Sequence, residues 1–124
     1  MNQTSPTLVK ATRIVAGITA ALVIVQGAQI GSFLQGDAAG LAAHRMTGTM
    51  IVTLLGLVLI GLAIVVRRTI RYVLPLAVVS LGAVVAQIGT GFTDLTTIHI
   101  PLGIAIFGMY AATALAPART AAAA

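Results

Sequence analysis

The sequence predicts an all-α fold, a transmembrane four-helix up-down bundle built from two repeated helical hairpins. Hydrophobic residues make up 59% of the 124 residues and charged residues only 7%, whereas soluble domains carry about 25% charged residues. The apolar residues gather in four runs separated by short polar gaps. Each run has close to the roughly 20 residues that a helix needs to cross the hydrocarbon core. Internal similarity between the two halves of the chain, described below, predicts the repeat.

Residues 1–124 are expected to form a single integral membrane domain. Its four spans cover residues 14–34, 44–66, 72–92 and 98–116. These spans are expected to be helical, because every backbone polar group in lipid needs a partner within the chain. The connections between the spans are short, so neighbouring helices are expected to run antiparallel.

The charged residues predict the orientation of the bundle. If the spans alternate in direction, Arg45 falls on one side together with both acids, Asp37 and Asp94. The other six basic residues fall on the opposite side: Lys10, Arg13, Arg67, Arg68, Arg71 and Arg119. Basic residues gather on the cytoplasmic side of membrane proteins. Both termini are therefore expected in the cytoplasm, with the chain in the cell's inner (plasma) membrane.

Two prolines are expected near the starts of the third and fourth helices. Pro75 and Pro101 are placed within the first turn, where the missing N–H costs little. Neither proline is therefore expected to mark a functional kink. The alanine-rich tail, residues 118–124, is expected to be frayed.

An internal repeat is the most informative feature of the sequence. The first and third spans end on AQIGS and AQIGT, at residues 28–32 and 86–90. In each half the next helix is expected to open with a histidine followed four residues later by glycine: His44 with Gly48, and His99 with Gly103. Two hairpins of the same direction predict a parallel repeat about an axis along the membrane normal. The two histidines are then expected at one depth, opposite each other across the bundle core.

This spacing predicts a haem site with His44 and His99 as iron ligands. Histidine within membrane helices is costly and usually faces the bundle interior, and imidazole is a common axial ligand of haem iron. Residues four apart share a helix face, so Gly48 and Gly103 would leave room for a flat macrocycle beside each ring. The chain has no cysteine, which leaves histidine and oxygen as the available metal ligands.

Three further polar residues are expected to complete the site. Arg45 is adjacent to His44 and could pair with a haem propionate, since arginine binds carboxylates bidentately. Gln29 and Gln87 could orient an imidazole or bond a propionate. Other interpretations stay open, because Arg45 could extend to the headgroups and the glutamines could bond between helices.

Other functions are also compatible with the pattern. The histidines could hydrogen-bond each other in a non-haem accessory or assembly subunit, or contact a quinone. A small proton-coupled transporter is less favoured, because such carriers need an acid within the membrane and Asp37 and Asp94 fall in loops. Three methionines that could in principle bind haem iron are expected to fill the core instead: Met46, Met50 and Met109.

The residues of the site resemble a known family. His44-Arg45 followed by Gly48 resembles the start of the second helix in the haem A synthase family, and Gln87 with Gly89, then His99, resembles its third and fourth helices. Eight-helix members of that family are built from two related four-helix bundles, each with a histidine pair near the extracytoplasmic surface. The resemblance implies one haem b per bundle, held between His44 and His99.

The chain also departs from that family. Leu41 stands where the family has a glutamate implicated in haem oxidation, the paired loop cysteines of many bacterial members are absent, and only one bundle is present. The resemblance therefore implies a structural or electron-transferring haem, or pairing with a second copy, rather than synthase activity. The leading expectation is an electron carrier or respiratory accessory subunit, as a homo-oligomer or within a larger respiratory complex, and no nucleic-acid partner is expected.

Overall fold

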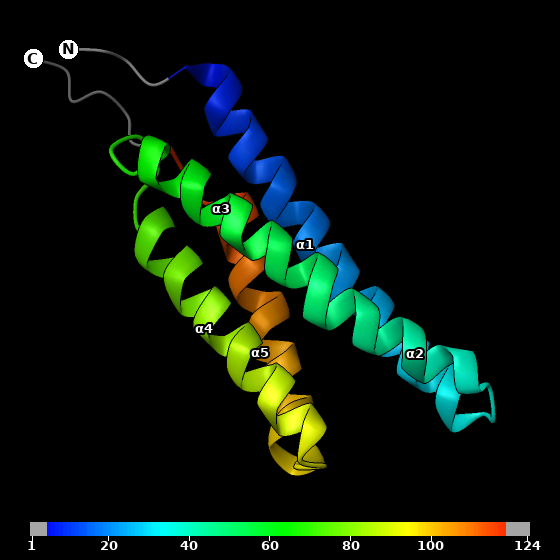
Figure 1. The fold of residues 1–124 in the computed structure, drawn as a ribbon. Helices are drawn as coiled ribbons and strands as arrows, with labels where there is room; N and C mark the ends of the chain where they lie inside the picture. Colours follow the sequence, from blue (N-terminus) through cyan, green and yellow to red (C-terminus); the bar gives the residue numbers. More distant parts are fainter. Residues whose placement is uncertain (1–4, 119–124) are drawn as a thin grey trace, which may run out of the picture.

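The computed structural model describes residues 5–118, and the elements of regular structure in this range are all helices (Figure 1). The elements are α1 (Pro6–Leu34), α2 (Ala38–Met46), the π-helix η1 (Thr47–Val52), α3 (Thr53–Val66), α4 (Val73–Phe92) and α5 (Thr96–Leu115). Because α2, η1 and α3 continue into one another, they form a single long helix, Ala38–Val66.

Four helices in the described part of the chain are long and apolar enough to cross a membrane. They coincide with the four expected spans, and the protein is a multi-pass membrane protein. Three helices begin earlier than expected: α1 at Pro6, α2 at Ala38 and α5 at Thr96. Pro6 starts α1, a position that suits proline because its N–H would have no partner there. Asp37 caps α2, since its carboxylate accepts a hydrogen bond from the Ala39 N–H at 3.0 Å.

These starts change the position of two residues that the sequence placed at helix openings. His44 is the seventh residue of α2, so the expectation that it opens a helix is wrong. Pro101 is the sixth residue of α5 and lies inside that helix, so its placement in the first turn is also wrong. Pro75, the third residue of α4, lies in the first turn as expected.

The helices pack around a core of small and branched side chains. α1 packs against α2, α3 and α5, and α4 packs against α3 and α5. Ala16, Leu59, Ala63 and Ala77 are almost fully buried in this core. Small residues let membrane helices approach closely, where packing rather than water exclusion drives association. Many large apolar side chains point outward, as expected for helices surrounded by lipid.

Buried positions recur between α1 and α4 with a constant offset. The buried residues Thr12, Ala16 and Thr19 of α1 correspond to Val73, Ala77 and Ser80 of α4, each 61 positions later (12 to 73, 16 to 77, 19 to 80). The two helices therefore direct equivalent faces into the core. The AQIG motifs are separated by 58 positions (28 to 86), so they are out of this register by three residues.

The π-helix adjusts the register of the other two long helices. From His44 to the buried Val52 there are eight positions, whereas from His99 to the buried Ile106 there are seven. A π-helix holds more residues per turn than an α-helix, so η1 absorbs the additional residue. π-helical turns occur frequently at functional sites, and this one begins three residues after His44.

The two ends of the molecule carry different charges. The start of α1, the α3–α4 turn and the end of α5 lie at one end (Figure 1), where Arg13 donates to the Ala116 carbonyl at 2.9 Å and Ile70 pairs with Ala118. The described basic residues other than Arg45 belong to this end: Lys10, Arg13, Arg67, Arg68 and Arg71. Arg119 lies outside the described residues. The turns that carry Asp37 and Asp94 lie at the opposite end (Figure 1).

Candidate functional site

A cavity of about 490 Å³ lies at the end of the molecule that carries the acidic residues. It is lined by residues of α1, α2, η1, α4 and α5, most of them apolar. Its volume is within the roughly 300–1,000 Å³ typical of ligand pockets. Six of the seven predicted site residues line it: His44, Arg45, Gly48, Gln87, His99 and Gly103. Gln29 is not among the lining residues.

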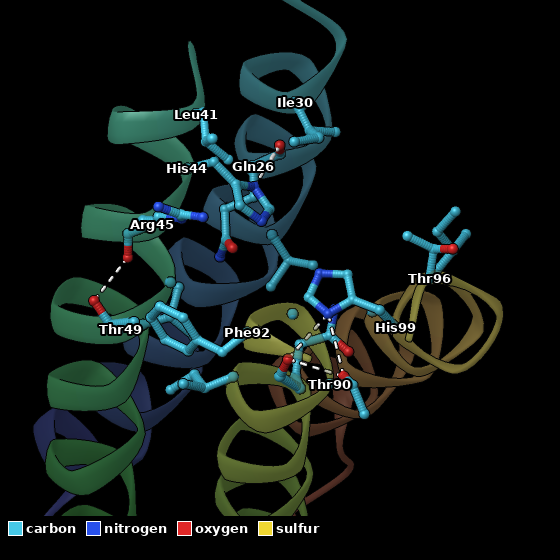
Figure 2. A pocket seen from close by; sticks show the side chains of 18 of the residues that line it. Gln26, Ile30, Leu41, His44, Arg45, Thr49, Thr90, Phe92, Thr96 and His99 are labelled. Carbon is cyan, nitrogen blue, oxygen red and sulfur yellow. Dashed lines mark hydrogen bonds between the residues drawn. The ribbon is translucent and has the colours of Figure 1, made fainter. Parts of the chain in front are cut away.

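The two histidines face each other across this cavity (Figure 2). Their ring centroids are 6.0 Å apart and their planes are inclined by 56°. Each ring uses Nδ1 to contact a main-chain carbonyl of the neighbouring helix: His44 to Gln26 at 3.1 Å and His99 to Gln87 at 3.0 Å. A carbonyl oxygen only accepts, so the hydrogen-bond network assigns the proton to Nδ1. The lone pair of each ring is then on Nε2.

His99 has additional contacts with α4. The Thr90 hydroxyl donates to the Gln87 carbonyl at 3.0 Å, and its oxygen is 3.2 Å from His99 Nδ1. The ring also lies directly against Gly91, where a Cβ atom would be 2.8 Å from His99 Cε1. Glycine at position 91 therefore permits the close approach of the imidazole to the α4 backbone.

Glutamine side chains occupy the space beside the two site glycines. A Cβ atom on Gly48 would be 2.8 Å from Gln26 Oε1, and one on Gly103 would be 3.1 Å from Gln87 Nε2. The glycines do leave room next to the histidines, but in this structure amide groups take it up. Gln26 and Gln87 therefore have equivalent positions, one on α1 and one on α4.

Sequence reasoning missed Gln26 and chose Gln29 in its place. The Gln29 amide donates to Thr47 Oγ1 at 3.1 Å and so contacts the π-helix, outside the cavity. Gln26 precedes Gln87 by 61 positions, the same offset as the buried pairs of α1 and α4. The sequence does contain the pattern that identifies Gln26, because Thr19 and Ser80 are also 61 positions apart. The AQIG match, with its offset of 58, pointed to Gln29 instead.

Two glutamine oxygens near this region have no hydrogen-bond partner. Gln87 Oε1 and Gln29 Oε1 are both buried and unpaired. An unpaired polar group in an apolar environment costs free energy. The Gln87 side chain lines the cavity, but its unpaired oxygen is covered by protein atoms, so a ligand reaches that oxygen only when the amide turns.

Arg45 and Phe92 lie at the exposed rim of the cavity. The guanidinium carbon of Arg45 is 5.7 Å from the centroid of the Phe92 ring, within the range of a cation–π contact. Arg45 is the one Lys or Arg side chain among the lining residues, and Asp94 is the one acid. Leu41 also lines the cavity. The rim can therefore bind a carboxylate through Arg45, whereas Leu41 offers no acid or base.

Residues 5–118 hold no cluster of three or more His, Cys, Asp or Glu side chains that could bind a metal ion. The cavity offers two imidazole nitrogens as metal ligands. The other ligands of a bound metal would come from water, from side-chain oxygens of the cavity or from a cofactor such as a porphyrin with its four nitrogens.

The chain matches no protein-family model, no curated protein and no solved structure. Inference about function therefore begins from the cavity and its two histidines.

Proposed function

We propose that this protein binds one haem b between His44 and His99 and serves as a membrane electron carrier or an accessory subunit of a respiratory complex. The observation that carries the proposal is the facing pair of histidines, with ring centroids 6.0 Å apart. A metal ion lies about 2 Å from each imidazole nitrogen it binds, and two rings on opposite sides of it then have centroids about 6 Å apart. The observed separation fits this arrangement.

The hydrogen bonds of the rings support the same proposal. Imidazoles that bind metals donate their other N–H to a carbonyl or carboxylate, which fixes the tautomer and the ring orientation. Both Nδ1 atoms have such a carbonyl partner, Gln26 for His44 and Gln87 for His99. Each Nε2 is thereby left as the ligating atom. Two neutral histidines that hydrogen-bonded each other would need an N–H donor on one of the rings. That ring would then have to give up the Nδ1 hydrogen bond to its carbonyl.

The remaining lining residues suit an amphipathic macrocycle. Arg45 is at the rim, where it can leave Phe92 and pair with a propionate. Val23, Val52 and Ile106 provide apolar walls. Bound haem supplies one-electron chemistry, and the protein's part is to hold the rings, exclude water and set the polarity around them. Leu41 provides no carboxylate for oxidation of the macrocycle, so we favour electron transfer over a synthase reaction.

The proposal includes an architecture and an orientation. The 61-residue offset between α1 and α4 supports two repeated hairpins, as in one half of the haem A synthase family. The basic end of the molecule supports cytoplasmic termini, which places the haem near the extracytoplasmic surface of the plasma membrane. A second copy of the chain or a larger respiratory complex would receive the electron.

Titration of the purified protein with hemin tests this function. We expect one hemin per chain and a sharp Soret band, because two imidazoles give a low-spin iron. Conversion of both ligands, His44→Ala with His99→Ala, is expected to abolish the band. The matched control is Gln29→Ala, whose side chain lies outside the cavity, and it is expected to titrate like the wild type. A wild-type protein that stays colourless would refute the proposal.

A second candidate function is contact with a quinol, supported by the unpaired Gln87 Oε1. Once the amide turns toward the cavity, a quinol hydroxyl can donate to that oxygen while an imidazole nitrogen accepts from the second hydroxyl. Under this alternative, Gln87→Leu would abolish quinol binding, and hemin would give no Soret band. Equilibrium binding of a short-chain quinol to the haem-free protein distinguishes the two functions.

A further inference from the structure

The His99 side chain has more restraining contacts than the His44 side chain. His99 Nδ1 has two oxygens within reach, the Gln87 carbonyl at 3.0 Å and Thr90 Oγ1 at 3.2 Å. His44 Nδ1 has one, the Gln26 carbonyl at 3.1 Å. The His99 ring also rests against the α4 backbone at Gly91. His99 is therefore restrained by three features, and His44 by a single hydrogen bond.

This difference follows from a substitution between equivalent positions. The offset of 61 that relates Gln26 to Gln87 also relates Gln29 to Thr90. Thr90 is short, and its hydroxyl reaches His99. Gln29 is long and turns away to bond Thr47. His44 consequently lacks the hydroxyl that His99 has.

The helix that carries His99 also packs against more of its neighbours than α2, the segment that carries His44. α5, which carries His99, packs against both α1 and α4. α2, which carries His44, packs against α1 and continues into η1, and within residues 5–118 its Cα atoms come within 8 Å of no residue in α4 or α5. The π-helix begins one residue after α2 ends, and π-bulges are among the places where helices bend. The helix is anchored to α4 through η1 and α3, so a bend at η1 would move α2 without breaking a contact of α2 with α4 or α5, whereas α5 would have to leave both α1 and α4.

We propose that His99 is the permanent ligand of the bound haem and His44 the exchangeable one, so that a small neutral molecule such as carbon monoxide takes the place of His44. This inference rests on the proposed haem site. In haem reduced with dithionite, His44 Nε2 would leave the iron and the carbon atom of carbon monoxide would take its place, while His99 would remain bound. No electron or proton is transferred, because the His44 hydrogen stays on Nδ1 and is still donated to the Gln26 carbonyl.

The two single alanine variants form the matched test. We expect His44→Ala to retain haem with an affinity close to wild type and to bind carbon monoxide faster. We expect His99→Ala to lose at least about tenfold in haem affinity, the lower end of the effect of removing support from a metal ligand. The reduced wild-type protein is expected to shift its Soret band on addition of carbon monoxide. Equal losses in the two variants, a greater loss in His44→Ala, or an unchanged wild-type spectrum would overturn the inference.

Thr90 provides a second test in which both histidines are present. Thr90→Val is expected to speed dissociation of haem about tenfold, and Thr90→Ser to restore the wild-type rate. Thr93→Val is the control, since Thr93 is not among the residues that line the cavity and its hydroxyl donates to the Gly89 carbonyl at 2.9 Å. A Thr90→Val rate equal to that of Thr93→Val would contradict the role of Thr90.

A measurement on the haem-free protein separates this inference from the proposed function. Nitrogen-15 NMR of the imidazoles reports the exchange of each Nδ1 hydrogen with solvent. We expect that of His99 to exchange at least about tenfold more slowly than that of His44, because two oxygens hold it. Slow exchange with no hemin binding would refute the haem site alone, whereas equal exchange rates would refute the asymmetry alone.

Discussion

The end of the bundle near the α3–α4 turn is closely packed, with Val66, Ile70 and Val73 buried, whereas the opposite end holds the cavity. At the first end, the hydroxyls of Thr12, Ser80 and Thr113 are buried and each donates to a carbonyl of its own helix. At the cavity end, Gln87 Oε1 is unpaired and each histidine has a free ring nitrogen. We therefore expect substitutions in the closely packed end to act mainly on stability and substitutions around the cavity to act mainly on ligand binding.

The largest effect on hemin binding is expected from a methyl group placed against His99. Gly91→Ala puts a Cβ atom 2.8 Å from His99 Cε1, which forces the ring off the α4 backbone. We expect hemin affinity to fall at least about tenfold, while the melting temperature of the haem-free protein stays within a few degrees of wild type.

The matched control for that change is Gly89→Ala, because a Cβ atom at Gly89 would meet nothing within 4 Å. Hemin titrations of both variants, with thermal melts of the haem-free forms, provide the comparison. Equal hemin affinities for the two variants would show that the ring position at Gly91 does not matter.

The opposite pattern is expected from the core at the other end. Leu59 is fully buried and outside the cavity, and Leu59→Ala is expected to lower the free energy of unfolding by about 2–5 kcal/mol. Chemical denaturation in detergent micelles measures this loss. Hemin affinity of the folded fraction is expected to remain at the wild-type value, and a selective loss of hemin binding would break the division between the two ends.

A smaller effect is expected where α2 begins. Asp37→Ala removes the N-cap hydrogen bond to Ala39 and the contact that the Ser32 hydroxyl donates to the same carboxylate at 2.8 Å. The free energy of unfolding is expected to fall by about 1 kcal/mol. Asp37→Asn is the comparison, since an asparagine side-chain oxygen at this position still accepts from the Ala39 N–H. Denaturation curves that shift equally for both variants would contradict the assignment of the cap.

The sequence predicted the helical fold well, because four long apolar runs in a chain with nine charged residues leave few alternatives to membrane helices. It also paired His44 with His99, since both precede a glycine by four residues. It could not place Gln26, because the register of α1 against α4 is set by the packing of buried residues such as Thr19 and Ser80 rather than by the AQIG motif. The π-helix was also hidden, since no local residue preference marks the extra position that it absorbs.

The absorption spectrum of the dithionite-reduced protein, after hemin is added and the excess removed, tests the central claim most directly. The pair of imidazoles with centroids 6.0 Å apart predicts a low-spin spectrum with a sharp α band, at one haem per chain. A spectrum without that band, or one that persists unchanged in the protein lacking both His44 and His99, would contradict the assignment of the site.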